Sequence, residues 1–110
     1  MDRKPAKTPA PPYYSVTTTA SLGKKHDPHR HVSLGLALYA QAETIDGFLG
    51  WEVMMETDFS IAISYWRSLG SIETWRHHEG HCGAKQLGKK WFSHCITRIA
   101  LVERDYGFEE

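Results

Sequence analysis

The sequence predicts one small α+β domain in which strands and helices follow the order β-α-β-β-α-β. Three observations support this prediction. Residues 59–66 alternate between large apolar and smaller side chains, as in a strand with two different faces. Residues 28–44 carry apolar residues at three- and four-residue spacing, which is typical of one helix face. A length of 110 residues suits a single domain, which we expect to occupy residues 13–110.

The N-terminal segment, residues 1–12, has the composition of a disordered tail. It contains four of the five prolines and three basic residues, and no large apolar residue follows Met1. Such a segment buries too little apolar surface to offset the chain entropy lost on ordering. We therefore expect a disordered, proline-rich tail before the folded domain.

The first half of the domain predicts a strand, a helix and a turn. Residues 13–19 are rich in β-branched and aromatic side chains and predict the first strand. Asp27 is suited to cap a helix that begins at Pro28 and runs to about Thr44. Gly47 can adopt the left-handed conformation that ends a helix. The apolar face of this helix is formed by Leu34, Leu38, Ala42 and Ile45.

The middle of the chain predicts a hairpin. Residues 48–55 form the second strand and residues 59–66 the third, with a polar turn of three residues between them. In the third strand, side chains on alternate residues share a face. One face carries Phe59, Ile61, Ile63 and Tyr65, and the other carries Ser60, Ala62, Ser64 and Trp66.

The last third predicts a helix and a strand. The helix is expected from Ser71 to about Gly88, with a break near Gly80 and Gly83, because each glycine costs a helix about 1 kcal/mol relative to Ala. The fourth strand is expected over residues 94–106. Its centre, residues 99–102, is apolar on both faces, which indicates a strand covered on both sides.

This order of elements is the ferredoxin-like arrangement, a four-stranded antiparallel sheet with two helices on one face. The helices leave the other sheet face open, although residues 99–102 require cover on both sides. A second copy of the chain is the simplest cover. We therefore expect a homodimer that closes a dimeric α+β barrel.

Charge and motifs exclude several classes of function. Lys and Arg together number 13, as do Asp and Glu, so the chain lacks the basic surplus expected of a nucleic-acid or membrane-surface binder. No apolar run approaches the length of a membrane span. Cys82 and Cys95 are expected to be free thiols, as in a cytoplasmic protein. No dinucleotide or P-loop fingerprint occurs, and we expect no cofactor.

Four stretches of the sequence resemble the antibiotic biosynthesis monooxygenase family of dimeric α+β barrel proteins. Residues 46–52 read DGFLGWE, residues 63–68 ISYWRS, residues 75–81 WRHHEGH and residues 102–108 VERDYGF. The resemblance covers nearly all of the domain. It implies a cofactor-independent monooxygenase that oxidises a phenolic, quinol or polyketide-like aromatic molecule with dioxygen. It leaves open a non-catalytic small-molecule-binding or stress-related protein of the same fold.

The same resemblance leaves a haem-binding or haem-degrading dimer as a third hypothesis. Haem-degrading relatives use an asparagine in the first strand and a histidine late in the second helix. This sequence contains no Asn, and Lys85 occupies the position of that histidine. We rank this hypothesis last.

The candidate site residues lie on the third strand and the second helix. In the family the ligand cavity lies between helices and sheet, so His78 or His81 is expected to take a proton from the substrate, as a neutral imidazole can. The expected substrate-binding residues are Trp66, Ser64, Ala62 and Trp75. We expect no metal site at His77 and His81, and we interpret His26, His29 and His31 as a solvated cluster.

Overall fold

The computed structural model describes residues 3–78 and 86–110, and it confirms the predicted order of elements. Residues 86–91 are also helical. The labelled elements are β1 (Tyr13–Leu22), α1 (Pro28–Ala42), β2 (Phe48–Met55), β3 (Phe59–Trp66), α2 (Leu69–Arg76) and β4 (Phe92–Val102). No helix in these residues is both long and apolar enough to cross a membrane.

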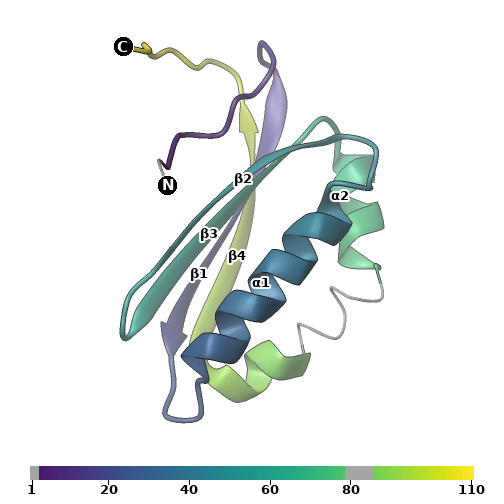
Figure 1. The fold of residues 1–110 in the computed structure, drawn as a ribbon. Coiled ribbons are helices and arrows are strands. Elements are labelled where there is room, and N and C mark those ends of the chain that lie inside the picture. The colour runs from purple at the N-terminus through teal and green to yellow at the C-terminus, as the bar shows by residue number, and fades with distance from the viewer. Residues whose placement is uncertain (1–2, 79–85) are drawn as a thin grey trace.

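The strands form one four-stranded antiparallel sheet in the order β2-β3-β1-β4. Figure 1 shows α1 and α2 on the same side of this sheet, as the ferredoxin-like arrangement requires. Strand register fixes which residues face the helices. Val16 pairs with Ser64 on β3 and with Ile99 on β4, so these three side chains share the helix-facing side.

The predicted boundaries of β2 and β3 agree with the structure, whereas those of β1 and α1 differ. β1 continues to Leu22 because it pairs with β3 and β4 beyond Thr19. α1 begins at Pro28 as predicted, and the Asp27 side chain accepts a hydrogen bond from the Arg30 N–H at 3.1 Å. The helix ends at Ala42 rather than Thr44, because the Thr44 N–H and hydroxyl both donate hydrogen bonds to the Gln41 carbonyl instead of continuing the helical pattern.

The predicted limits of the second helix and the last strand were wrong. α2 begins at Leu69, two residues earlier than expected, because Ser68 rather than a later residue caps it. α2 ends at Arg76 and does not reach Gly88 as one helix. The expected break near Gly80 and Gly83 lies outside the described residues. β4 runs from Phe92 to Val102, where its pairing with β1 ends at Tyr13.

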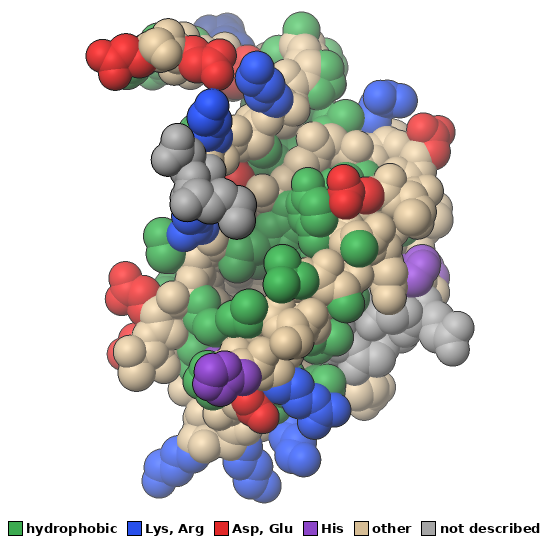
Figure 2. Space-filling view, in the orientation of Figure 1, with side chains coloured by type: hydrophobic (Ala, Val, Ile, Leu, Met, Phe, Trp, Pro, Cys, Tyr) green, Lys and Arg blue, Asp and Glu red, His purple; other side chains and the backbone are tan. Residues whose placement is uncertain are grey.

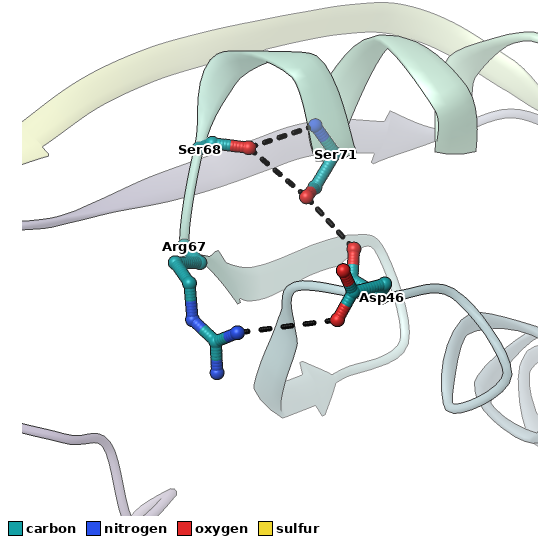
Figure 3. Close-up of polar contacts among 4 residues, drawn as sticks. All are labelled: Asp46, Arg67, Ser68 and Ser71. Atoms are coloured by element: carbon teal, nitrogen blue, oxygen red, sulfur yellow. Dashed lines mark hydrogen bonds and ion pairs between the residues drawn. The ribbon is translucent and has the colours of Figure 1, made fainter.

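The start of α2 is joined to the turn that follows α1 (Figure 3). The Ser68 hydroxyl accepts the Ser71 N–H at 3.1 Å, and the Ser71 hydroxyl donates to the Asp46 carbonyl at 2.8 Å. Arg67 and the Asp46 carboxylate add an exposed ion pair at 3.9 Å. Gly47, beside Asp46, has a φ of +99°, as predicted for a residue that ends the α1 turn. These contacts fix α2 relative to α1.

The core lies where both helices meet the end of β3. Ala42, Trp66, Ile72 and Trp75 form one buried cluster, and the Trp66 and Trp75 rings stack with centroids 6.1 Å apart. Phe48 packs edge-on against Trp66 at 5.1 Å. α1 is also apolar on its outer side, and Figure 2 shows hydrophobic side chains across the middle of this view. The exposed apolar residues of α1 are Val32, Leu36 and Tyr39.

Residues 3–12 form no helix or strand and run beside β2 and the C-terminal segment. The Ala6 N–H donates to the Glu52 carboxylate at 2.9 Å, and the Arg3 guanidinium donates to the Val53 carbonyl. Tyr13 donates its hydroxyl to the Asp105 carboxylate. The expected disorder of this tail in solution stays a prediction.

Replacing Gly47 with Ala is expected to destabilise the fold by about 2 kcal/mol or more. A Cβ there would lie 2.0 Å from the Ser71 hydroxyl, and the backbone conformation already disfavours a side chain. Gly35 is the matched control, because a Cβ on this α1 glycine would meet nothing within 4 Å. Gly35→Ala should stabilise the protein by up to about 1 kcal/mol in urea unfolding. Equal effects of the two substitutions would contradict this account of the turn.

Candidate functional site

A cavity of about 820 Å³ lies on the helix-facing side of the sheet. α1, α2 and helical residues 86–91 contribute to its wall, together with all four strands. Its volume falls within the range of small-molecule pockets, roughly 300–1,000 Å³. Among the described residues, the Trp and Phe side chains that line it are Trp51, Trp75, Trp91 and Phe92, and its two histidines are His31 and His94.

The sheet side of the cavity is built from small residues. β3 contributes Ser60, Ala62 and Ser64, which alternate along the strand and therefore point to the same face. On β1 and β4, Thr18 and Thr97 face each other with their hydroxyl oxygens 3.0 Å apart. Small side chains here leave the space that larger ones would fill.

His31 lines the cavity from the first turns of α1. Its Nδ1 lies 2.7 Å from Nε2 of His26, so the two imidazoles share a hydrogen bond. The His31 ring also contacts Trp91, with centroids 5.5 Å apart, and Phe92, with centroids 5.7 Å apart. His31 is therefore an imidazole held between aromatic rings at the wall of the cavity.

The environment of His31 keeps its ring uncharged at neutral pH. Burial lowers the pKa of His31 from its ordinary value of 6.5, and electrostatic repulsion from the neighbouring His26 imidazole lowers it further. A neutral imidazole retains one nitrogen lone pair that can accept a proton. His31 can therefore serve as a general base in this cavity.

The formal charges on the cavity wall are positive. Arg76 and Lys89 line it, and no Asp or Glu does so among residues 3–78 and 86–110. Arg76 is partly neutralised by Glu73, whose carboxylate lies 3.0 Å away. This distribution of charge favours an anionic over a cationic ligand.

Three of the four predicted substrate-binding residues line the cavity, namely Ser64, Ala62 and Trp75. Trp66 does not, since its side chain is 0% exposed and packs in the core. Its indole N–H donates to the Ser64 hydroxyl at 2.8 Å. Trp66 therefore holds the cavity-lining residue Ser64 from the core side of the wall. The binding roles of all four residues stay predictions.

The predicted base His78 lies just beyond the end of α2. Its ring packs against Trp75, with centroids 5.8 Å apart, but His78 is not among the described residues that line the cavity. His77 is exposed and lies 3.5 Å from the Glu73 carboxylate. His81 and Lys85 lie outside the described residues. A catalytic role for His78 or His81 stays a prediction.

The interpretation of His26, His29 and His31 as a solvated cluster was wrong for two of its members. His29 is exposed, whereas His26 and His31 are partly buried and packed against Trp91. The helical spacing carried a usable signal, because His31 precedes Leu34 by three residues and so extends the apolar stripe of α1. No group of three His, Cys, Asp or Glu side chains suited to a metal ion occurs within the described ranges.

Acidification is expected to weaken the fold through His31. Because the folded-state pKa is lowered, the unfolded chain binds more protons, and stability falls as pH drops from about 6.5 toward the lower folded pKa. Urea unfolding of the wild type and of His31→Gln at pH 7.5 and 5.5 measures this effect. The variant should lose less stability on acidification, and an equal loss in both proteins would contradict the burial of this imidazole.

Comparison with known proteins places the chain among relatives of the same fold. It matches no protein-family model. It is 38% identical over 112 residues to the uncharacterized protein YqjZ of Bacillus subtilis, an alignment that covers 96% of this chain and 92% of YqjZ. This identity over nearly the full length of both chains shows common family membership.

Solved structures share the fold at low sequence identity. A candidate antibiotic biosynthesis monooxygenase from Deinococcus radiodurans matches with a TM-score of 0.73 and 17% identity, over 88% of this chain and 99% of that one. SnoaB, a cofactor-independent oxygenase from Streptomyces nogalater, matches with a TM-score of 0.67 and 12% identity, over 89% and 98%. A dimeric ferredoxin-like protein from Thermobifida fusca gives 0.70 and 8%, over 90% and 100%. The chain belongs to the family of YqjZ and has the ferredoxin-like fold of the antibiotic biosynthesis monooxygenases.

Proposed function

We propose that the protein is a cofactor-independent monooxygenase that binds a flat phenolic or quinol molecule in the cavity. The observation that carries this proposal is His31, a partly buried imidazole of lowered pKa in the wall of an aromatic-lined cavity. In place of the bases expected from the sequence, His31 takes the substrate proton. His78, packed on the cavity residue Trp75, is the second candidate for this role.

The cavity suits a planar aromatic substrate. Trp75, Trp91 and Phe92 offer apolar ring surfaces, and the small residues of β3 leave room beside them. Lys89, on the same wall, stabilises the negative charge that develops when a phenol loses its proton. A phenol therefore packs against the aromatic rings of the cavity wall, and the nearby positive charge favours its deprotonated form.

The proposed reaction needs only the substrate and dioxygen. His31 removes the phenolic proton, and the resulting anion has carbanion character at a ring carbon. Transfer of an electron to dioxygen and radical recombination form a carbon–oxygen bond, giving a hydroperoxide once a proton is returned. Loss of water from this hydroperoxide leaves a quinone-type carbonyl. One dioxygen is consumed and takes four electrons from the substrate. One of its oxygen atoms becomes the carbonyl oxygen, and the other leaves as water.

The similarity of fold to SnoaB supports this reaction class, because that protein is a cofactor-independent oxygenase. Fold similarity alone does not define activity, since one fold hosts many functions. The competing hypothesis is a small-molecule-binding protein that uses the same cavity without turnover. The two differ in whether bound phenol consumes dioxygen.

We also propose that the protein forms a homodimer through the sheet face opposite the helices. Strand register places Met54, Ile61 and Ile96 in one row across this face. All three are exposed large apolar residues in the single chain. An apolar sheet face of this kind favours a self-complementary twofold contact. The solved dimeric ferredoxin-like neighbour supports the same assembly.

Removal of the His31 imidazole is expected to abolish most oxygen uptake. With an anthrone or naphthohydroquinone as probe, His31→Gln should lower kcat by about 10²–10⁴-fold, the usual contribution of a general base. His29→Gln is the matched control, since this exposed histidine lies on the same helix. Dioxygen consumption and product mass would be followed together.

A different pattern among these variants would redirect or refute the assignment. Loss of turnover in His78→Ala with His31→Gln unaffected would transfer the role of base to His78. Tight binding of the probe without dioxygen consumption in the wild type would support the non-catalytic binding protein instead.

A charge placed on the open sheet face is expected to separate the dimer. Ile96→Lys introduces an ammonium at a side chain that is 51% exposed in the single chain, so the monomer fold should tolerate it. Leu36→Lys is the control, because Leu36 is 70% exposed but lies on α1, on the other side of the sheet. Light scattering should give a dimer mass for the wild type and Leu36→Lys and a monomer mass for Ile96→Lys. A monomeric wild type would rule out the proposed assembly.

A further inference from the structure

We propose that His26 is a positioning residue that sets the tautomer of His31 and thereby makes it a base. This inference rests on the proposed role of His31 in proton removal. It concerns the hydrogen bond between the two rings, in which Nε2 of His26 and Nδ1 of His31 lie 2.7 Å apart.

The position of His26 is fixed by backbone contacts outside the cavity. Its N–H donates to the Gly23 carbonyl at 3.1 Å, and the Gly23 N–H donates to the Trp91 carbonyl at 2.6 Å. A Cβ on Gly23 would lie 3.0 Å from that same carbonyl, so a glycine permits this close approach. The turn between β1 and α1 is thus joined to the helical segment that ends at Trp91.

Aromatic contacts hold both imidazoles in place. The Trp91 ring lies 5.7 Å from His26 and 5.5 Å from His31, measured between centroids, and the two imidazoles stand nearly perpendicular at 84°. Trp91 itself is buried. Neither imidazole can turn away without losing contact with this buried ring, so the hydrogen bond between them is pre-formed.

One proton lies between the two facing nitrogens, and its location decides what His31 can do. If His26 donates, neutral His31 carries its own proton on Nε2 and has no lone pair left for a ligand. If His31 donates from Nδ1, its Nε2 keeps a free lone pair. Only the second arrangement allows His31 to accept the substrate proton.

The surroundings favour the second arrangement. Nε2 of His31 has no hydrogen-bond partner within residues 3–78 and 86–110. At the cavity wall, a bare Nε2 can accept a hydrogen bond from the hydroxyl of a bound phenol, whereas an N–H there would leave that acidic hydroxyl without this acceptor. His26 lies partly exposed before the helix, where water can satisfy its other nitrogen. His26 therefore accepts the Nδ1 proton of His31.

Nitrogen-15 NMR of the imidazole rings in the full-length protein tests this directly, without any need for turnover. At neutral pH, His31 should carry its proton on Nδ1 with a bare Nε2. His26→Ala should move the proton toward Nε2, because the acceptor is gone. His26→Gln should preserve the wild-type pattern, because its side-chain oxygen can replace Nε2 of His26. An Nε2 proton on wild-type His31, or an unchanged pattern in His26→Ala, would overturn the proposal.

Kinetics with the anthrone probe separates this proposal from the function on which it rests. His26→Ala should lower kcat by about 10–100-fold with KM unchanged, as loss of a residue that orients a catalytic group does. His26→Gln should restore most of kcat, and equal losses in both variants would contradict a positioning role. Absence of turnover in the wild type would refute the proposed function and leave the NMR result to stand alone.

Discussion

The packing of Trp66 at one end of β3 is the constraint on which the rest of the structure depends. The helix-facing side chains of β3 are small at Ser60, Ala62 and Ser64, and the next one, Trp66, is a large indole ring. Trp66 meets Trp75 and Ile72 of α2 and Ala42 of α1, so both helices are held against the sheet at the same end. Along the rest of the strand the side chains are too small to fill the layer. The cavity is the consequence of a core that large side chains fill around Trp66 but not along these small residues of β3.

The polar contacts around the turn after α1 reinforce this arrangement. Ser71 of α2 donates a hydrogen bond to the Asp46 carbonyl (Figure 3). Gly47 provides the backbone conformation that brings the two residues together. At the opposite end of α1, the Gly23–Trp91 hydrogen bond joins the β1–α1 turn to the helical segment before β4. The cavity is therefore bounded at both ends of α1, and His31 occupies the end away from the Trp66 core.

The fold could be predicted because its signals are local. Alternation in residues 59–66 defined β3, and Asp27–Pro28 defined the start of α1. The site was harder, because a cavity depends on which residues from distant segments meet. His31 was misinterpreted since its partner Trp91 lies sixty residues away along the chain, and no local pattern connects them. The burial of Trp66 in the core could not be predicted for a related reason, because strand alternation gives the face of a side chain but not its neighbours.

The proposed function requires that the cavity on the helix side of the sheet bind a flat phenol beside His31. NMR titration of the labelled protein with an anthrone, under exclusion of dioxygen, tests this claim most directly. We expect saturable shifts in the His31 ring and in the methyl groups of Thr18 and Thr97, while the methyl groups of Ile61 and Ile96 stay unchanged. Shifts confined to Ile61 and Ile96, or no saturable shift at millimolar probe, would contradict it.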